Sequence, residues 1–195
     1  RATAARSFTI NGITASGVHA ISMNSSTVSG TSSIGINCSN VSGSNSAGIN
    51  GSIVSGDSST GINGSTVTGD DAVGIAGGAA LSDTCIAIMG GVSKYPLSVS
   101  IGTGTTNARN AYCIGRKSFA NSYSEFVIGS CNDSITGGNK TAWVATDRLF
   151  IIGNGADESN RSNALVMLKN GNTTANGNWT FSDTIMADEG FIKNK

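Results

Sequence analysis

A repeat of 13 residues, unbroken over nine turns of the chain, constrains the fold more than any other feature of this sequence. The clearest rows are VSGTSSIGINCSN (28–40), VSGSNSAGINGSI (41–53), VSGDSSTGINGST (54–66) and VTGDDAVGIAGGA (67–79). A fixed short period indicates that each repeat is one structural unit stacked on its neighbours. From Ser7 to about Gly115 we therefore predict an all-β fold, a parallel β-solenoid (β-roll) of 13-residue coils, left- or right-handed.

An apolar–small–apolar triplet recurs in every row and predicts a short strand. Its last column is apolar and reads Ile10, Met23, Ile36, Ile49, Ile62, Ile75, Ile88, Ile101 and Ile114. Its first column reads Phe8, Ile21, Ile34, Ala47, Thr60, Val73, Ile86, Val99 and Tyr112. The residues between them are small: Thr9, Ser22, Gly35, Gly48, Gly61, Gly74, Ala87, Ser100 and Cys113. Because alternate side chains of a strand point to opposite sides, we expect the apolar columns to face inward. The small column would then face outward, either against another subunit or as an uncrowded solvated face.

A second strand and two corners complete the predicted coil. The second strand is marked by Ala15, Val28, Val41, Val54 and Val67, and a glycine follows two residues later at Gly17, Gly30, Gly43, Gly56 and Gly69. We expect these glycines to turn the chain with an unusual φ. Asparagines close the first strand at Asn11, Asn24, Asn37, Asn50 and Asn63, where Asn tolerates a left-handed corner and can hydrogen-bond to its own copies. So narrow a coil has a thin core, which favours association with further copies.

The regular pattern ends after Gly115. Phe126 and Ile128 repeat the apolar pair one residue late, and Phe150 and Ile152 repeat it 24 residues further on. The insert at 133–147 is predicted to be an exposed excursion. We accordingly divide the chain into a solenoid at 1–130 and an irregular β-rich segment with short hairpins at 131–195.

Charge and cysteine usage narrow the classes of function. The net charge is zero, and no Lys or Arg occurs between Ser7 and Ser93, so we expect no nucleic-acid partner. No apolar run approaches the roughly 20 residues of a membrane span, so we expect no membrane insertion. The first ten residues, RATAARSFTI, lack the apolar core of a signal peptide and suggest an internal part of a longer chain. The cysteines Cys38, Cys85, Cys113 and Cys131 form no metal-binding spacing; we expect free, mostly buried thiols, and no metal or cofactor.

Catalytic patterns are weak, and we expect no enzyme. His19 is the single histidine and is expected on the surface. The pair Asp70–Asp71 favours a solvated turn over a calcium site. Asp57 and Asp70 occupy equivalent positions one coil apart, and paired acids of this kind can cleave glycosidic bonds. A solenoid enzyme acting on polysaccharide, as a phage tailspike depolymerase does, therefore stays open as an alternative. A minor one is an ice-binding solenoid, because Ser and Thr ladders run along one side.

Several rows resemble a known family. SSIGINCSNVSG, DAVGIAGGAALS and TCIAIMGG resemble the head repeats of trimeric autotransporter adhesins (the YadA-like head). The resemblance covers about residues 7–130, with a period of 13 where 14 is common and with Asn where the family has Gly after Ile. It implies a left-handed parallel β-roll, three chains around one axis, and adhesion to host molecules. SEFVIGSCN (124–132) and TDRLFIIGNGADESNRSNALVMLKNGN (146–172) resemble segments of phage tail fibres.

These resemblances imply an extracellular, homotrimeric, structural and adhesive fibre segment, in a phage tail fibre or on a bacterial surface. Its receptor would be a surface glycan or protein. Recognition usually depends on aromatic residues and arginine, and the faces of the repeats have almost none of these. We therefore expect receptor-binding residues in the irregular stretches, namely Lys94, Tyr95, Lys140, Trp143 and Arg148. In an alternative interpretation, Tyr95 and Trp143 only fill space in the solenoid where its coils are interrupted, and have no role in binding.

Overall fold

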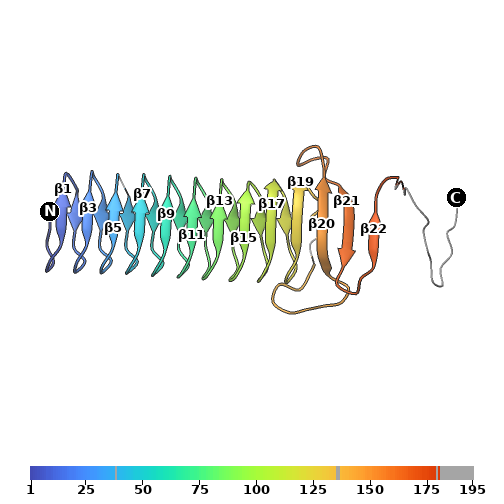
Figure 1. Cartoon of the computed structure of the whole chain (residues 1–195), viewed down its shortest axis with the longest axis horizontal. Helices are drawn as coiled ribbons and strands as arrows, with labels where there is room; N and C mark the ends of the chain where they lie inside the picture. Colours follow the sequence, from blue (N-terminus) through green and yellow to red (C-terminus); the bar gives the residue numbers. More distant parts are fainter. Residues whose placement is uncertain (38, 135–136, 179, 181–195) are drawn as a thin grey trace.

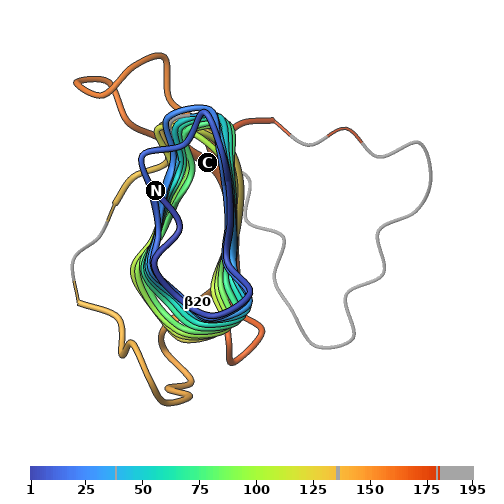
Figure 2. The ribbon, with the colours of Figure 1, turned by 90° about the vertical axis from the view of Figure 1, so that its left-hand side faces the viewer.

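The computed structural model describes residues 1–37, 39–134, 137–178 and 180. The chain forms a column of stacked coils that begins at the N-terminus and ends in a wider β-hairpin region (Figure 1). Viewed along the column, the coils superpose as a narrow ring with two long sides, and loops project only near the C-terminal end (Figure 2). Each regular coil contributes one strand to each of two sheets.

The longer sheet has 13 strands in the order β1-β3-β5-β7-β9-β11-β13-β15-β17-β19-β20-β21-β22. Their bounds are β1 Phe8–Ile10, β3 Ile21–Met23, β5 Ile34–Ile36, β7 Ala47–Ile49, β9 Thr60–Ile62, β11 Val73–Ile75, β13 Ile86–Ile88, β15 Val99–Gly102, β17 Tyr112–Arg116, β19 Phe126–Ser130, β20 Arg148–Asn154, β21 Asn163–Leu168 and β22 Thr173–Ala175. The shorter sheet has nine: β2 Thr14–Ala15, β4 Thr27–Val28, β6 Asn40–Val41, β8 Ile53–Val54, β10 Thr66–Val67, β12 Ala79–Ala80, β14 Val92–Ser93, β16 Thr105–Thr106 and β18 Phe119–Ala120.

The register confirms a parallel β-solenoid with 13-residue coils. Gly35 pairs with Gly48, and Gly48 pairs with Gly61, each 13 residues further on. The predicted break is also confirmed, since Phe126 pairs in parallel with Tyr112 on one side and with Phe150 on the other. β20, β21 and β22 then pair antiparallel and close the long sheet. Part of the predicted C-terminal hairpins, residue 179 and 181–195, lies outside the described residues.

The orientation of the apolar–small–apolar triplet is the reverse of our expectation. The small middle column faces the interior, where Ser22, Ala87 and Cys113 are fully buried. The flanking columns face outward, and Phe8 and Ile10 are 52% and 43% exposed. The expectation was wrong because a 13-residue coil is too narrow to hold two large apolar side chains per strand in its interior.

The two sheets lie too close together for large side chains to face each other. A Cβ atom added to Gly35 would lie 2.6 Å from Cγ2 of Val28, which points inward from the other sheet. The interior therefore holds one valine per coil, from Val28 to Val67, and the facing strand must be Gly, Ser, Ala or Cys at its middle position. The larger apolar side chains are displaced to the outer surface.

Serine fills the rest of this narrow interior. The hydroxyls of Ser33, Ser46 and Ser59 donate hydrogen bonds of 2.7–2.8 Å to the carbonyl oxygens of Gly43, Gly56 and Gly69 in the next coil. Since buried polar groups are costly when unpaired, these bonds make a serine-rich core tolerable. Hydrogen bonds between coils therefore add to the apolar contacts of the core.

The repeated glycines serve a purpose other than the one predicted. Gly43 and Gly56 do not have positive φ; instead, a Cβ on Gly56 would overlap the carbonyl oxygen of Gly69 in the next coil. The left-handed corner falls two residues later, at Asn45 and Ser58, with φ of 56° and 55°. The glycine is thus required by close stacking of backbones, and the turn uses a different residue.

The asparagine ladder is confirmed. Asn24, Asn37, Asn50 and Asn63 all have φ between 52° and 56°. Nδ2 of Asn24, Asn37 and Asn50 each donates to Oδ1 of the next asparagine at 2.8–2.9 Å. This corner is therefore stabilised both by residue type and by contacts along the column.

The cysteines agree with the expected buried thiols wherever they are described. Cys85, Cys113 and Cys131 are free and buried, while Cys38 lies outside the described residues. Burial raises the pKa of Cys113 to about 12 and also raises that of Cys85. Both therefore remain protonated at neutral pH and act as small apolar residues.

We predict that Gly56→Ala destabilises the fold by roughly 2 to 3 kcal/mol, because the added methyl meets a backbone carbonyl that cannot move aside. Ser55→Ala, at the neighbouring exposed position, is the control and should change stability by less than about 0.5 kcal/mol. Urea unfolding followed by circular dichroism measures both. Equal stabilities for the two variants would contradict the close stacking of coils.

Candidate functional site

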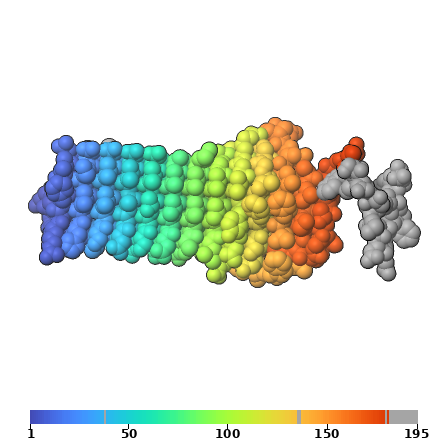
Figure 3. Space-filling view, in the orientation of Figure 1, coloured from blue at the N-terminus to red at the C-terminus, as the bar shows by residue number. Residues whose placement is uncertain are grey.

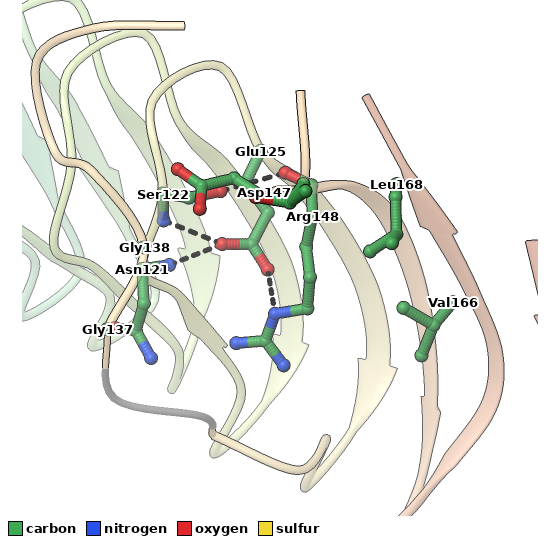
Figure 4. Close-up of a pocket in the computed structure, with 10 residues that line it drawn as sticks. Asn121, Ser122, Glu125, Gly137, Gly138, Asp147, Arg148, Val166 and Leu168 are labelled. Carbon is green, nitrogen blue, oxygen red and sulfur yellow. Dashed lines mark hydrogen bonds and ion pairs between the residues drawn. The ribbon is translucent and has the colours of Figure 1, made fainter. Parts of the chain in front are cut away.

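A pocket lies where the regular coils end. Its volume is about 300 Å³, and it is lined by the last coil, the returning excursion and the terminal hairpin. The lining residues are Asn121, Ser122, Glu125, Gly137, Gly138, Thr146, Asp147, Arg148, Val166 and Leu168. Figure 4 shows the Glu125 and Arg148 side chains pointing toward each other beside the strand that carries Val166 and Leu168.

Glu125 is a fully buried carboxyl group. Its Oε2 accepts hydrogen bonds from the backbone N–H groups of Asn121 and Ser122 at 2.6 and 2.7 Å. Its Oε1 lies 3.2 Å from Nε of Arg148 (Figure 4). Burial raises the pKa of Glu125, while the Arg148 charge and the hydrogen bonds from Ser122 and Asn121 act to lower it. The carboxyl therefore fastens the corner of the last coil to strand β20.

Arg148 is the first residue of β20 and only 8% exposed. Besides the ion pair with Glu125, its Nη1 donates to the carbonyl oxygen of Asp133 at 2.7 Å. The guanidinium thus joins the last coil, the start of the excursion and the hairpin. Arg148 is thus buried, unlike the other four residues predicted for receptor binding.

Lys94, Tyr95, Lys140 and Trp143 lie nearer the surface. Lys140 Nζ is 5.5 Å from the centre of the Tyr95 ring, and the Lys140 carbonyl accepts a 2.9 Å hydrogen bond from the Arg109 N–H. The excursion is therefore attached to the corner turns of the solenoid. Lys94 is exposed in the same turn as Tyr95, and Trp143 is 55% exposed further along the excursion. The structure thus brings Tyr95 and Lys140 together, with Trp143 on the same loop.

Lys169 is a functional candidate that the sequence analysis missed. Its amine is buried, lies 3.9 Å from Oδ2 of Asp147, and has no hydrogen-bond partner. The rings of Trp143 and Tyr123 lie 5.4 and 6.0 Å away. Desolvation lowers the pKa of Lys169, and the charges of Asp147 and Glu125 act in the opposite direction.

Glu125 was also missed, although a signal for it existed. With the one-residue shift of the last coil, Glu125 falls in the same inward column as Ser98 and Ala111, and all three are buried. A charged residue in an otherwise small, buried column indicates an ion pair at that point. Lys169 gave no such signal, because its burial depends on how the excursion folds back.

The acids and the histidine of the early coils lie outside this region. Asp57, Asp70 and Asp83 stack, and each carboxylate accepts a backbone N–H from the preceding coil at 2.7–3.2 Å. His19 is exposed beside Arg6. Among the residues that the structure describes, no three His, Cys, Asp or Glu side chains are grouped as metal ligands. Over that same part of the chain no helix is long and apolar enough to cross a membrane.

No family model, curated protein or solved structure matches this chain.

We predict that Glu125 and Arg148 are strongly coupled. Arg148→Met should destabilise the fold by roughly 3 to 5 kcal/mol, since it leaves a buried carboxyl without its cation. In a Glu125→Gln background, where no charge needs compensation, the same substitution should cost much less. Urea unfolding of the four proteins measures this coupling. Equal costs in the two backgrounds would show that the ion pair is not the interaction that holds the corner.

Proposed function

We propose that this chain is a segment of a homotrimeric surface fibre that attaches its bearer to a receptor on another surface. The observation that supports it is the outer face of the 13-stranded sheet, which is apolar along the length of the solenoid. We call this surface the apolar face. It consists of the first and last residues of the triplets from Phe8 and Ile10 to Phe126 and Ile128.

The apolar face is continuous and carries no charge. Ile34, Ile86, Tyr112 and Phe126 on it are 36–43% exposed. At its C-terminal end the rings of Tyr112, Phe126 and Phe150 lie next to one another, with centroids 6.2 and 5.7 Å apart. An exposed apolar patch that runs along the column marks an interaction site, because monomeric soluble proteins rarely expose large contiguous patches of this kind. A surface of this kind favours contact with another protein surface.

A further copy of the chain fits this face well. The ridges formed by stacked coils repeat at one spacing along the column, as the rows of Figure 3 show, so parallel copies can keep one register throughout. The outer face of the nine-stranded sheet is more polar, with Thr14, Thr27, Asn40 and Thr66, and would remain in water. The resemblance to trimeric adhesin heads supports three copies around an axis.

Attachment to a receptor would use the corner that bears Tyr95, Lys140 and Trp143. Tyr95 lies in a corner turn, where the chain passes from one sheet to the other, and Lys140 and Trp143 lie in the excursion. None of the three is on the apolar face. They would therefore remain accessible after assembly. The chain would act outside the cell, as part of a phage tail fibre or of a bacterial surface adhesin.

The two alternative functions gain no support from the described residues. The carboxylates of Asp57, Asp70 and Asp83 are engaged with backbone N–H groups. The outward positions of the nine-stranded sheet mix Thr with Asn and Ile, where ice binding would need a regular Thr surface.

A pair of isoleucines on opposite faces tests the assembly. Ile86 on the apolar face and Ile53 on the other sheet are 37% and 51% exposed. The parent chain and Ile53→Asp should both have a mass near three times 19.6 kDa, about 59 kDa, by light scattering. Ile86→Asp should be a folded monomer, because it places a charge in the centre of the buried interface. A monomeric parent chain, or a trimeric Ile86→Asp, would contradict the proposal.

The receptor corner is tested separately. Binding of the fluorescently labelled chain to intact bacterial and animal cells should be reduced at least about tenfold by Tyr95→Ala with Trp143→Ala, since aromatic anchors dominate recognition. Ile13→Ala with Ile53→Ala, at two exposed positions away from this corner, is the control and should leave binding unchanged. Unaltered binding by the aromatic double variant, with its melting temperature also unaltered, would place the site elsewhere.

A further inference from the structure

The buried amine of Lys169 lies too far from its nearest carboxylate for an ordinary hydrogen-bonded ion pair. A charged lysine and an aspartate normally approach to 2.7–2.9 Å, whereas here Nζ and Oδ2 of Asp147 are 3.9 Å apart. Oδ2 instead accepts a 2.8 Å hydrogen bond from the Asn139 N–H. A buried polar group without a hydrogen bond in a native fold points to a specific role.

The backbone holds the two side chains next to each other. Lys169 follows β21 and Asp147 precedes β20, and the Lys169 N–H donates to the Asp147 carbonyl oxygen at 2.9 Å. The two residues continue the pairing of Arg148 with Leu168 by one position, just beyond the ends of the strands. The amine and the carboxyl therefore cannot diffuse apart, and reactions between groups held in this way gain a large effective concentration.

The surroundings of this pair suit bond formation. Trp143 and Tyr123 cover the amine, and desolvation lowers the pKa of Lys169, which favours the neutral, nucleophilic form. A second carboxyl, Glu125, lines the same pocket as Asp147 and is close enough for its charge to act on the amine. Burial raises the pKa of Glu125, and a raised pKa makes a carboxyl a better acceptor for a proton that it then passes on.

We propose that Lys169 and Asp147 join spontaneously through an isopeptide bond, an amide between their side chains, in the folded protein. Nζ of Lys169 attacks Cγ of Asp147, the new C–N bond forms, and a C–O bond of the carboxyl breaks. The neutral amine gives up one proton and the protonated carboxyl gives up its OH group, and these leave together as one water molecule, so no oxidant, cofactor or activated donor is needed. Glu125 carries the proton from the attacking nitrogen to the leaving oxygen.

Such a bond would tie the terminal hairpin to the base of the excursion. It closes the chain between Asp147 and Lys169, at the point where the last parallel strand, β20, meets the antiparallel strands. The end of the solenoid would then resist opening under a pulling force, which noncovalent contacts of an edge hairpin resist poorly. The inference does not depend on trimer assembly or on receptor binding.

The mass of the purified full chain, measured under denaturing conditions, tests the bond directly. We expect a mass about 18 Da below that of the sequence, the loss of one water. Digestion should also yield a branched peptide that joins Lys169 to Asp147. An unmodified mass in a chain that is folded by near-ultraviolet circular dichroism would overturn the proposal.

Three variants separate this bond from other losses of water. Lys169→Arg keeps the positive charge but cannot form the bond, and should have the full mass. Asp147→Asn should form the same bond with loss of ammonia, about 17 Da. Glu125→Gln retains an oxygen for the Asn121 and Ser122 N–H groups and should slow the reaction at least about tenfold. A loss of 18 Da that persists in Lys169→Arg would indicate cyclisation of an aspartate with its own backbone and would also overturn the proposal.

Discussion

The close approach of the two sheets determines most of this structure. Where Val28 and Val41 point inward, the opposite strand has space only for Gly35 and Gly48. The same limitation recurs along the column, where Gly56 lies under the backbone of Gly69 in the next coil. A 13-residue coil cannot hold a conventional apolar core, so its interior is one valine, several serines and the glycines that let backbones meet.

The chemistry of the outer surface follows from that narrow interior. Large apolar side chains that do not fit inside are placed on the outside of the 13-stranded sheet, with Phe8 52% and Tyr112 43% exposed. Exposing so much apolar surface is costly in water, and the cost is offset if other copies cover the apolar face. The thin core and the proposed assembly are in this way two consequences of one geometric limit.

The C-terminal end departs from this scheme because its coil widens. Relative to the 13-residue coil, the insertion of one residue before Phe126 and of eleven before Phe150 makes room for Glu125, Arg148 and a pocket. Polar groups there are satisfied by ion pairing between segments in addition to hydrogen bonds with the backbone. The irregular end is consequently where we propose chemistry, at Lys169 and Asp147, and recognition, at Trp143 together with Tyr95 of an earlier, regular coil.

The sequence by itself determined the period, the parallel stacking, the Asn24–Asn63 ladder and the coil in which regularity ends. Each of these depends on residues repeated at fixed intervals, which local physics converts into one structure per repeat. Only the tertiary structure decided which side of each strand faces inward. Alternation shows that Ile62 and Gly61 point to opposite sides, but the distance to Val54 on the other sheet sets which one is buried. The tertiary structure likewise decided the pairing of Lys169 with Asp147, because their approach depends on the path of a loop that has no repeat to specify it.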